Sequence, residues 1–248
     1  MRTRDKCPLC EAPAARAEHC VRTRNGYELH ECPSCTLVYD KEILEEDELL
    51  TIYDEAYARR YEEEALARQN RSYADRFFSR KPRGRVLEVG CGTGHFLRRL
   101  GEFGFETYGV EVNPACAAYA SDLRVVVAPF EEMPQVWPEG WFDYVVTFHL
   151  LEHLAEPVAA VQKAAAFLKP DGVWFNYMPH VRARGRRLQS PAWIHFNPAH
   201  RGEHVNFFDE PTLRLLAEKA GLEVYRVEAG GDDFWSEARL RRAPNQPK

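Results

Sequence analysis

Short apolar runs alternate with amphipathic segments from about Arg85 to the end of the chain. Runs of this length, bounded by turn residues, are typical of strands, and the segments between them fit helices. Strands are predicted at residues 86–89, 106–110, 124–127, 142–148, 173–177, 222–227 and 233–240. Strands that alternate with helices in this way predict a doubly wound α/β sheet.

Helix and turn signals occupy the spaces between these strands. A helix is expected at residues 95–100, and a Pro-Asp-Gly turn at residues 170–172 precedes the fifth strand. Between the fourth and fifth strands an apolar stripe has helical spacing, at Val158, Val161, Ala165 and Leu168. Near the end, Asp209 is predicted to cap a helix with Pro211 in its first turn and Gly221 at its end.

The stretch from residue 41 to 81 is rich in Glu, Arg and Tyr and is predicted to be helical. Tyr53, Tyr57 and Tyr61 recur every four residues, which puts them on one helical face. Core packing is the simplest explanation of such a stripe. Pattern and composition divide the chain into a cysteine-containing module at residues 1–40, a helical cover at 41–81 and an α/β domain at 82–248.

Composition narrows the class of protein. The 248 residues are 45% hydrophobic and 12% aromatic, enough for one sizeable core with a small appended module. No apolar run approaches the roughly 20 residues that cross a bilayer, so a cytoplasmic protein without membrane contact is expected. The net charge of −5 disfavours a general nucleic-acid surface. A basic run, either a solvated loop or a contact for an anionic substrate, is present at Arg182, Arg184, Arg186 and Arg187.

Four of the seven cysteines form two Cys-x-x-Cys pairs, at Cys7, Cys10, Cys32 and Cys35. Four thiolates complete the tetrahedral shell of a structural zinc ion. About forty residues with few large apolar groups could hardly order themselves without metal. A redox pair or unpaired thiols are the alternatives. His19, Cys20 and His30 are weaker ligand candidates, and Cys91 and Cys116 are expected to be packed thiols.

A glycine-rich turn follows the first predicted strand, with Gly90, Gly92 and Gly94 at alternate positions. Glycines let the backbone turn tightly and approach a ligand closely, because no Cβ intervenes. A dinucleotide-binding fingerprint would need its third glycine at His95, and a phosphate loop would need Gly-Lys-Ser/Thr. Both departures count against a dehydrogenase or a nucleotide hydrolase.

This segment resembles motif I of class I S-adenosylmethionine-dependent methyltransferases, in which an acid stands two residues before the first glycine. The resemblance places Glu88 near the ammonium end of the methionine moiety and Glu111, one strand later, on the ribose hydroxyls. A carboxylate suits two neighbouring hydroxyls because it accepts several hydrogen bonds. The full set of implied cofactor contacts is Glu88, Gly90, Cys91, Gly92, Gly94, Glu111, Phe130, Glu131 and His149.

Later blocks at residues 142–146, 149–153 and 168–172 extend the resemblance over most of residues 85–227. It implies a Rossmann-like seven-stranded methyltransferase sheet. The loop after the third strand departs from the family: an Asp often lies there near the adenine, whereas this chain reads Ala-Pro-Phe-Glu at residues 128–131. Adenine contacts are therefore expected from the backbone and Phe130.

The cysteine pairs and the tyrosine-rich stretch resemble a bacterial group of methyltransferases with an N-terminal zinc ribbon. That resemblance implies a helical cover over the cofactor cleft. One of Tyr53, Tyr57 and Tyr61 would then approach the sulfonium, whose charge an aromatic face stabilises. Core packing of the three rings remains the alternative.

Methyl transfer is an in-line displacement, so holding donor and acceptor in contact supplies much of the rate. A general base is needed when the acceptor must lose a proton. His149, just after the fourth strand, is one candidate. Glu203 and His204 are the others, because their Glu-His-x-x-Phe-Phe segment resembles the one that supplies a base in zinc-containing sugar C-methyltransferases. Alternatively, this Glu-His-x-x-Phe-Phe segment only fixes the conformation of its own loop. His153 is expected to cap or pack beside the next helix.

The connection at residues 180–201 has no clear periodicity and is a natural lid over the acceptor. Its arginines could clamp a phosphate or carboxylate. The leading hypothesis is methylation of a small molecule, such as a sugar nucleotide or another biosynthetic intermediate. The alternatives are an RNA methyltransferase whose zinc ribbon docks nucleic acid, and a non-catalytic scaffold protein.

Overall fold

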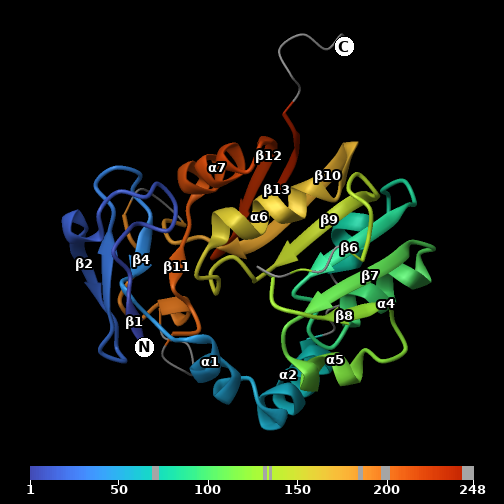
Figure 1. Cartoon of the computed structure of the whole chain (residues 1–248), viewed down its shortest axis with the longest axis horizontal. Coiled ribbons are helices and arrows are strands. Elements are labelled where there is room, and N and C mark those ends of the chain that lie inside the picture. Colours follow the sequence, from blue (N-terminus) through green and yellow to red (C-terminus); the bar gives the residue numbers. More distant parts are fainter. Residues whose placement is uncertain (69–72, 131–132, 134–135, 184–186, 197–201, 242–248) are drawn as a thin grey trace.

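The computed structural model describes residues 1–68, 73–130, 133, 136–183, 187–196 and 202–241. Its main feature is a mixed seven-stranded sheet (Figure 1). The strands, in spatial order, are β12 (Leu222–Gly230), β13 (Asp233–Leu240), β10 (Leu168–Pro179), β9 (Phe142–Phe148), β6 (Arg85–Val89), β7 (Glu106–Glu111) and β8 (Val125–Val127). The five strands from β10 to β8 run parallel, and β13 lies antiparallel between β10 and β12. The carboxyl ends of β6, β7, β9 and β10 therefore meet at one edge.

Helices cover both faces of this sheet. On one face, Val86 and Val146 share a buried cluster with side chains of α4 (His95–Glu102) and the π-helical turn η2 (Ala74–Phe78). On the other, Leu87 and Val145 are buried with side chains of α6 (Pro157–Ala166) and α7 (Glu210–Lys219). Neighbouring residues of one strand thus serve opposite cores, as the two-residue period of a strand requires. A further helix, α5 (Pro114–Tyr119), follows β7.

The seven predicted strands are all present, and the predicted α/β fold is confirmed. The predicted start of the fifth strand was wrong. Strand β10 already begins at Leu168, so the Pro-Asp-Gly segment forms an irregularity inside the strand and Leu168 does not belong to the helical stripe. Helix α7 begins as predicted: the Asp209 carboxylate accepts a hydrogen bond from the Thr212 amide at 3.0 Å, and the chain turns at Gly221 with φ +77°.

The N-terminal module contains a second sheet, whose order is β11-β4-β3-β2. Strands β2 (Glu18–Arg22), β3 (Glu28–Glu31) and β4 (Val38–Asp40) come from the module, whereas β11 (Asn206–Phe207) comes from the other end of the chain. The short strands β1 (Arg2–Thr3) and β5 (Glu42–Ile43) pair beside it, and η1 (Ala14–Arg16) is a 3-10 turn. The module is therefore joined to the main domain by backbone hydrogen bonds.

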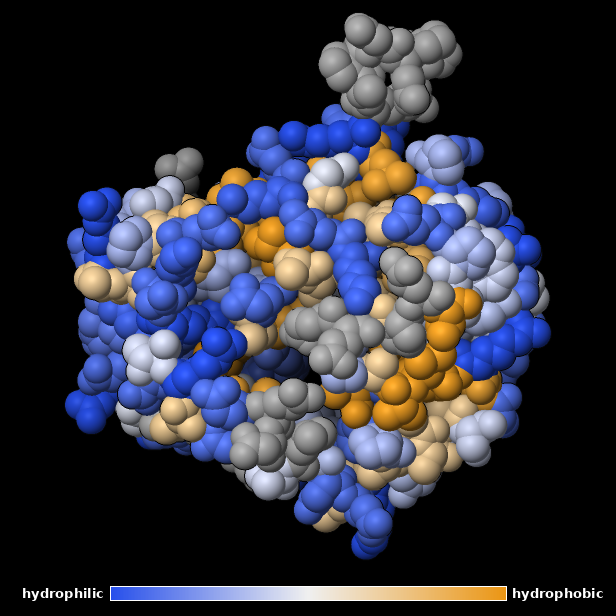
Figure 2. Space-filling view, in the orientation of Figure 1, coloured by the Kyte–Doolittle hydropathy of each residue, from blue (hydrophilic) through white to orange (hydrophobic). Residues whose placement is uncertain are grey.

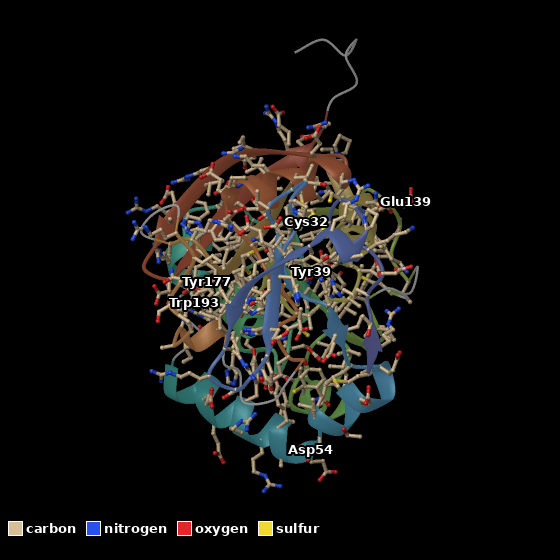
Figure 3. The ribbon with its side chains drawn as sticks, turned by 90° about the vertical axis from the view of Figure 1, so that its left-hand side faces the viewer. Cys32, Tyr39, Asp54, Glu139, Tyr177 and Trp193 are labelled. Carbon is tan, nitrogen blue, oxygen red and sulfur yellow. The ribbon has the colours of Figure 1, made fainter. Side chains whose placement is uncertain are left out.

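Two short helices, α1 (Glu46–Ile52) and α2 (Glu55–Arg68), connect the module to the main sheet along the lower edge of the molecule (Figure 1). The prediction that the three tyrosines share one face of a single helix was wrong, because α1 ends at Tyr53 and α2 is a separate helix. The Asp54 carboxylate accepts a hydrogen bond from the Tyr57 amide at 2.7 Å and so caps the start of α2. Asp54 lies at the bottom of the view in Figure 3. The rings of Tyr53 and Tyr57 still lie 4.9 Å apart. Within the described ranges, no helix has both the length and the apolar character needed to cross a membrane.

Candidate functional site

The glycine-rich turn lies at the carboxyl edge of the sheet, between β6 and α4. Gly90, Gly92 and Gly94 have φ values of +79°, +53° and +81°, in the left-handed region that favours glycine. The amides of Gly90 and Cys91 both donate to the carbonyl of Val110, at 2.9 and 3.1 Å, which holds the turn over the end of β7. The turn thus presents backbone without side chains at the point where ligands bind in such sheets.

Two buried carboxylates lie next to this turn. Glu111 accepts hydrogen bonds from the amides of Gly92, at 2.7 Å, and Asn113, at 2.8 Å. Glu88 is 4% exposed, and within the described residues its Oε2 atom has no hydrogen-bond partner. Burial raises the pKa of both groups, and the charge of Glu111 raises the pKa of Glu88 further. A buried pair of this kind suits a ligand that brings a cation and hydroxyl donors.

Helix α2 covers the turn through Tyr61. A Cβ atom placed on Gly92 would lie 2.7 Å from the Tyr61 ring. Tyr61 as a whole is 37% exposed, but desolvation of its hydroxyl raises its pKa, and the charges of Glu88 and Glu111 raise that pKa further. An interaction between His95 Nε2 and Glu62 Oε2 at 2.8 Å ties α2 to α4. The predicted helical cover therefore contacts the glycine turn directly.

Apolar side chains complete the wall of the turn. A Cβ atom on Gly90 would meet Leu150 at 3.1 Å and Phe130 at 3.6 Å. Cys91 is buried, and its thiol packs toward Gly109 on β7, where an added Cβ would lie 2.6 Å from Sγ. Burial raises the pKa of the Cys91 thiol well above its usual value, as expected for a packed thiol. Glu131, also a predicted cofactor contact, lies outside the described residues.

Four histidines gather around Glu152 at the ends of β9 and β10. The rings of His153 and His204 lie 4.7 Å apart, those of His195 and His204 5.8 Å, and those of His149 and His195 6.4 Å. His149 has a left-handed backbone with φ +45°, which is unusual for a side-chain-bearing residue and typical of functional sites. Its Nδ1 atom is 3.3 Å from Glu152 Oε1.

Burial and the nearby imidazoles have opposite effects on the pKa of Glu152. Burial would raise the pKa of Glu152, but the hydrogen bond with His149 and the nearby imidazoles lower it to about 2. Burial, together with the charge of His204, lowers the pKa of His153 and His195 to about 4 each. At neutral pH, Glu152 is therefore ionised, and His153 and His195 are neutral. Sequence reasoning missed Glu152 and His195 as members of this site.

The tyrosines of the cover are subject to the charges of acids in both the glycine turn and the histidine cluster. Burial raises the pKa of Tyr53, and the charges of Glu203, Glu111 and Glu152 raise it further. Glu203 is itself buried and acts on Tyr57 in the same way. The acids of both regions therefore act on the same group of tyrosines. In the space-filling view, the face shown is hollowed between the N-terminal module and the main sheet (Figure 2).

A sequence profile for a methyltransferase domain matches residues 57–227. The chain belongs to this methyltransferase-domain family. The matched range contains the glycine turn, both buried acids and the histidine cluster.

Among curated relatives, the ubiquinone biosynthesis O-methyltransferase of Xanthomonas campestris pv. campestris (strain B100) is 31% identical over 102 residues, which are 38% of this chain and 42% of the relative. The enzyme of the same name from Thiobacillus denitrificans (strain ATCC 25259 / T1) is 26% identical over 186 residues, 64% of this chain and 79% of the relative. The chain thus spans less than half the length of the first of these relatives.

Solved structures show the same fold at low identity. A methyltransferase from Haloferax volcanii, in complex with the activator Trm112, has a TM-score of 0.63 at 16% identity and covers 76% of this chain and 97% of its own. A possible histamine N-methyltransferase from Thermotoga maritima has a TM-score of 0.58 at 20% identity, covering 76% and 99%. At these identities the likeness concerns the fold alone.

Outside the methyltransferase domain, the four paired cysteines converge as predicted. The Sγ atoms of Cys7 and Cys35 lie 3.6 Å apart, and those of Cys10 and Cys32 lie 3.5 Å apart. These distances are too long for disulfides and close to the roughly 3.8 Å expected between thiolates around tetrahedral zinc. All four ligand atoms lie within 4.8 Å of one another, whereas Cys20 donates to the Leu29 carbonyl instead.

The two cysteine knuckles have the same backbone geometry. The amide of Cys7 donates to Ala12 and the amide of Cys32 donates to Leu37, at 2.8 and 2.9 Å. Each second cysteine is followed by a left-handed residue: Glu11 has φ +62° and Thr36 has φ +64°. Such repeated turns bring two thiols of each pair to one side, so the donor set fits a four-thiolate zinc ion.

The connection after β10 packs on the N-terminal module. Trp193 and Phe196 are buried in a cluster with β2, β3 and β4. Arg182 pairs with Glu31 at 2.7 Å and with Asp209 at 3.2 Å, so it links the module to α7 and is not an anion clamp. Of the other arginines in this run, Arg187 is exposed, and Arg184 and Arg186, like His200, lie outside the described residues.

Proposed function

We propose that the chain is an S-adenosylmethionine-dependent methyltransferase that acts on a small-molecule acceptor. The main observation in support is the buried pair Glu88 and Glu111 beside three left-handed glycines. Glu88 has a buried oxygen that can accept from the ammonium of the methionine moiety. Glu111 has further acceptor capacity for ribose hydroxyls while it holds the Gly92 amide. Gly90, Cys91, Gly94 and Phe130 would supply the remaining contacts described above.

The acceptor is expected to be a small hydroxylated molecule. The curated relatives named above are O-methyltransferases, which favours oxygen over carbon or nitrogen as the methylated atom. The net charge of −5 remains unfavourable for an RNA substrate. We infer that such a molecule enters through the hollow between the module and the main sheet (Figure 2).

S-adenosylmethionine, when bound, supplies a methyl group on a positively charged sulfur. The acceptor oxygen forms a bond to the methyl carbon while the carbon–sulfur bond breaks, and that electron pair stays on sulfur. We assign His149 as the base that takes the acceptor proton, because it follows β9 directly and its ring is oriented by Glu152. We assign Glu203 and His204 to contact the acceptor. The ring of Tyr61 is assigned to stabilise the positive charge of the sulfonium.

We also propose that Cys7, Cys10, Cys32 and Cys35 hold a structural zinc ion. Residues 1–40 would then form a zinc-holding module, 41–81 the cover and 82–248 the catalytic domain. Strand β11 supports a coupled arrangement, because it places residues of the catalytic domain in the sheet of the module.

Replacing Glu111 with alanine is expected to weaken the binding of S-adenosylhomocysteine about 30-fold. The change removes hydrogen bonds to a charged acceptor, worth about 2 kcal/mol in total. Isothermal titration calorimetry measures the affinity. Glu106→Ala, on the same strand but at its exposed amino end, is the control and should bind normally. Equal affinities for both variants would refute the proposed cofactor site.

The affinity for S-adenosylhomocysteine is expected to rise with pH. Burial and Glu111 raise the pKa of Glu88, so part of the protein carries a neutral Glu88 that attracts the ligand ammonium poorly. Raising the pH ionises Glu88 and strengthens binding, by at most about tenfold per pH unit below its pKa. Calorimetry over roughly pH 6 to 8 measures this slope. Glu88→Gln should flatten it, and a slope that persists in this variant would contradict the assignment.

Replacing His149 with asparagine is expected to lower turnover about 100-fold at saturating cofactor. The reason is that the variant keeps the loop but loses the proton acceptor. Transfer of labelled methyl groups into a cell extract measures the rate. His19→Asn, on exposed β2, is the control for a lost imidazole. Normal turnover in His149→Asn would remove this residue from the chemistry.

A further inference from the structure

We infer that Glu152, His153 and His204 form a second metal site, which binds a divalent cation beside the acceptor. One ligand atom from each of these residues lies within 4.8 Å of the other two. Glu152 and His153 follow β9, and His204 precedes β11 on a separate segment. Cation–ligand distances of about 2.1 Å bring such atoms to about 3 to 3.5 Å from one another, so small side-chain rotations close the set.

Each imidazole has one nitrogen engaged by the main chain and the other available to a cation. The Nδ1 atom of His204 lies 2.8 Å from the carbonyl oxygen of His195. Since a carbonyl only accepts, Nδ1 carries the proton and Nε2 keeps its lone pair. The ring of His153 is hydrogen-bonded to the backbone of Glu203, and within the described residues its buried Nδ1 has no partner. Metal-binding histidines are oriented by such main-chain contacts.

The Glu152 carboxylate likewise has one oxygen engaged by a side chain and one available to a cation. His149 Nδ1 lies 3.3 Å from Oε1 of Glu152, whereas Oε2 is buried without a partner among the described residues. A buried carboxylate oxygen and a buried imidazole nitrogen that both lack partners are costly unless something binds them. A cation between them satisfies both atoms and compensates the buried negative charge.

Two imidazole nitrogens and one carboxylate oxygen suit borderline first-row cations, from manganese to zinc. Three protein ligands leave at least one coordination position open, as in catalytic metal sites. Tyr177 and Trp193, labelled near one another in Figure 3, border the cluster: the first lies 5.2 Å from the His149 ring and the second 4.8 Å from the His195 ring. The role of the cation rests on the proposed function: its open position would receive an oxygen of the acceptor and orient it for methylation.

Cobalt(II) is a suitable probe because its absorption bands report its ligands. Protein loaded with one equivalent of zinc, which the cysteine quartet takes first, is titrated with cobalt(II). We expect one further equivalent to bind, with visible bands of a nitrogen and oxygen site and without a thiolate-to-cobalt charge-transfer band. Glu152→Gln and His204→Gln should each weaken this binding at least about tenfold. Glu156→Gln, an exposed carboxylate on the same segment, is the matched control and should bind normally.

Failure of this site and failure of the proposed function are distinguishable. Every variant is also titrated with S-adenosylhomocysteine, whose retained binding shows that the protein is folded. Three results overturn the second metal site: no cobalt binding by the unmodified protein, cobalt binding by Glu152→Gln and His204→Gln as tight as that of the unmodified protein, or a thiolate band with released zinc. Cobalt binding without any affinity for S-adenosylhomocysteine supports the metal site and overturns the methyltransferase proposal instead.

Discussion

Cys32→Ser protein is expected to lose its zinc and to unfold at least about 10 °C below the unmodified protein. Structural zinc contributes an apparent binding free energy of about 10 to 16 kcal/mol, and one lost thiolate removes a substantial part of it. Each kcal/mol changes the melting temperature by about 2 to 4 °C in a domain of this size. Elemental analysis measures the zinc, and calorimetric unfolding measures the melting temperature.

The effect should reach beyond the module because its core is continuous with that of the methyltransferase domain. Cys32 and Tyr39 lie in the same buried cluster as Leu151 and Phe208, and β4 pairs with β11. Cys20→Ser is the matched control, since a serine hydroxyl can also donate to the Leu29 carbonyl. A Cys32 variant that keeps both its zinc and its melting temperature would show that the quartet is not a zinc site.

The main fold was predictable because its signals are local. Apolar runs mark the strands, and Asp209 and Gly221 mark the two ends of α7. Boundaries were less accurate where a local signal competed with pairing. The turn-forming residues 170–172 were predicted to precede the fifth strand, but Leu168 already pairs with Phe142 of β9, so β10 begins before the turn.

The contacts between distant segments had no such signal. The sheet of the N-terminal module includes the strand formed by Asn206 and Phe207. This strand has only two residues and lies more than a hundred residues after the module in the sequence. The break at Tyr53 was detectable, because Asp54 is a favourable cap, but the four-residue spacing of the tyrosines obscured it.

The candidate site also has one part that the sequence predicted and one part that it did not. The glycine turn and its acids are close in sequence or follow adjacent strands, so the sequence pattern placed Gly92 and Glu111 together, as the structure does. The histidine cluster depends on the path of the connection after β10. That path brings His195 and His204 to Glu152, and no periodicity within residues 180–201 indicated it.

Gly92→Val protein is expected to bind S-adenosylhomocysteine about 1000-fold more weakly than the unmodified protein. A branched side chain is strained at φ +53°, and its Cβ atom would lie 2.7 Å from the Tyr61 ring, at the place where the backbone must approach the ligand. A loss of about 4 kcal/mol in binding corresponds to this factor. Gly104→Val separates strain from crowding, because Gly104 has φ +84° and nothing within 4 Å of an added Cβ. The Gly104 variant should be less stable but bind with normal affinity, as measured by calorimetry. If the two variants bind equally well, the glycine turn does not hold the cofactor.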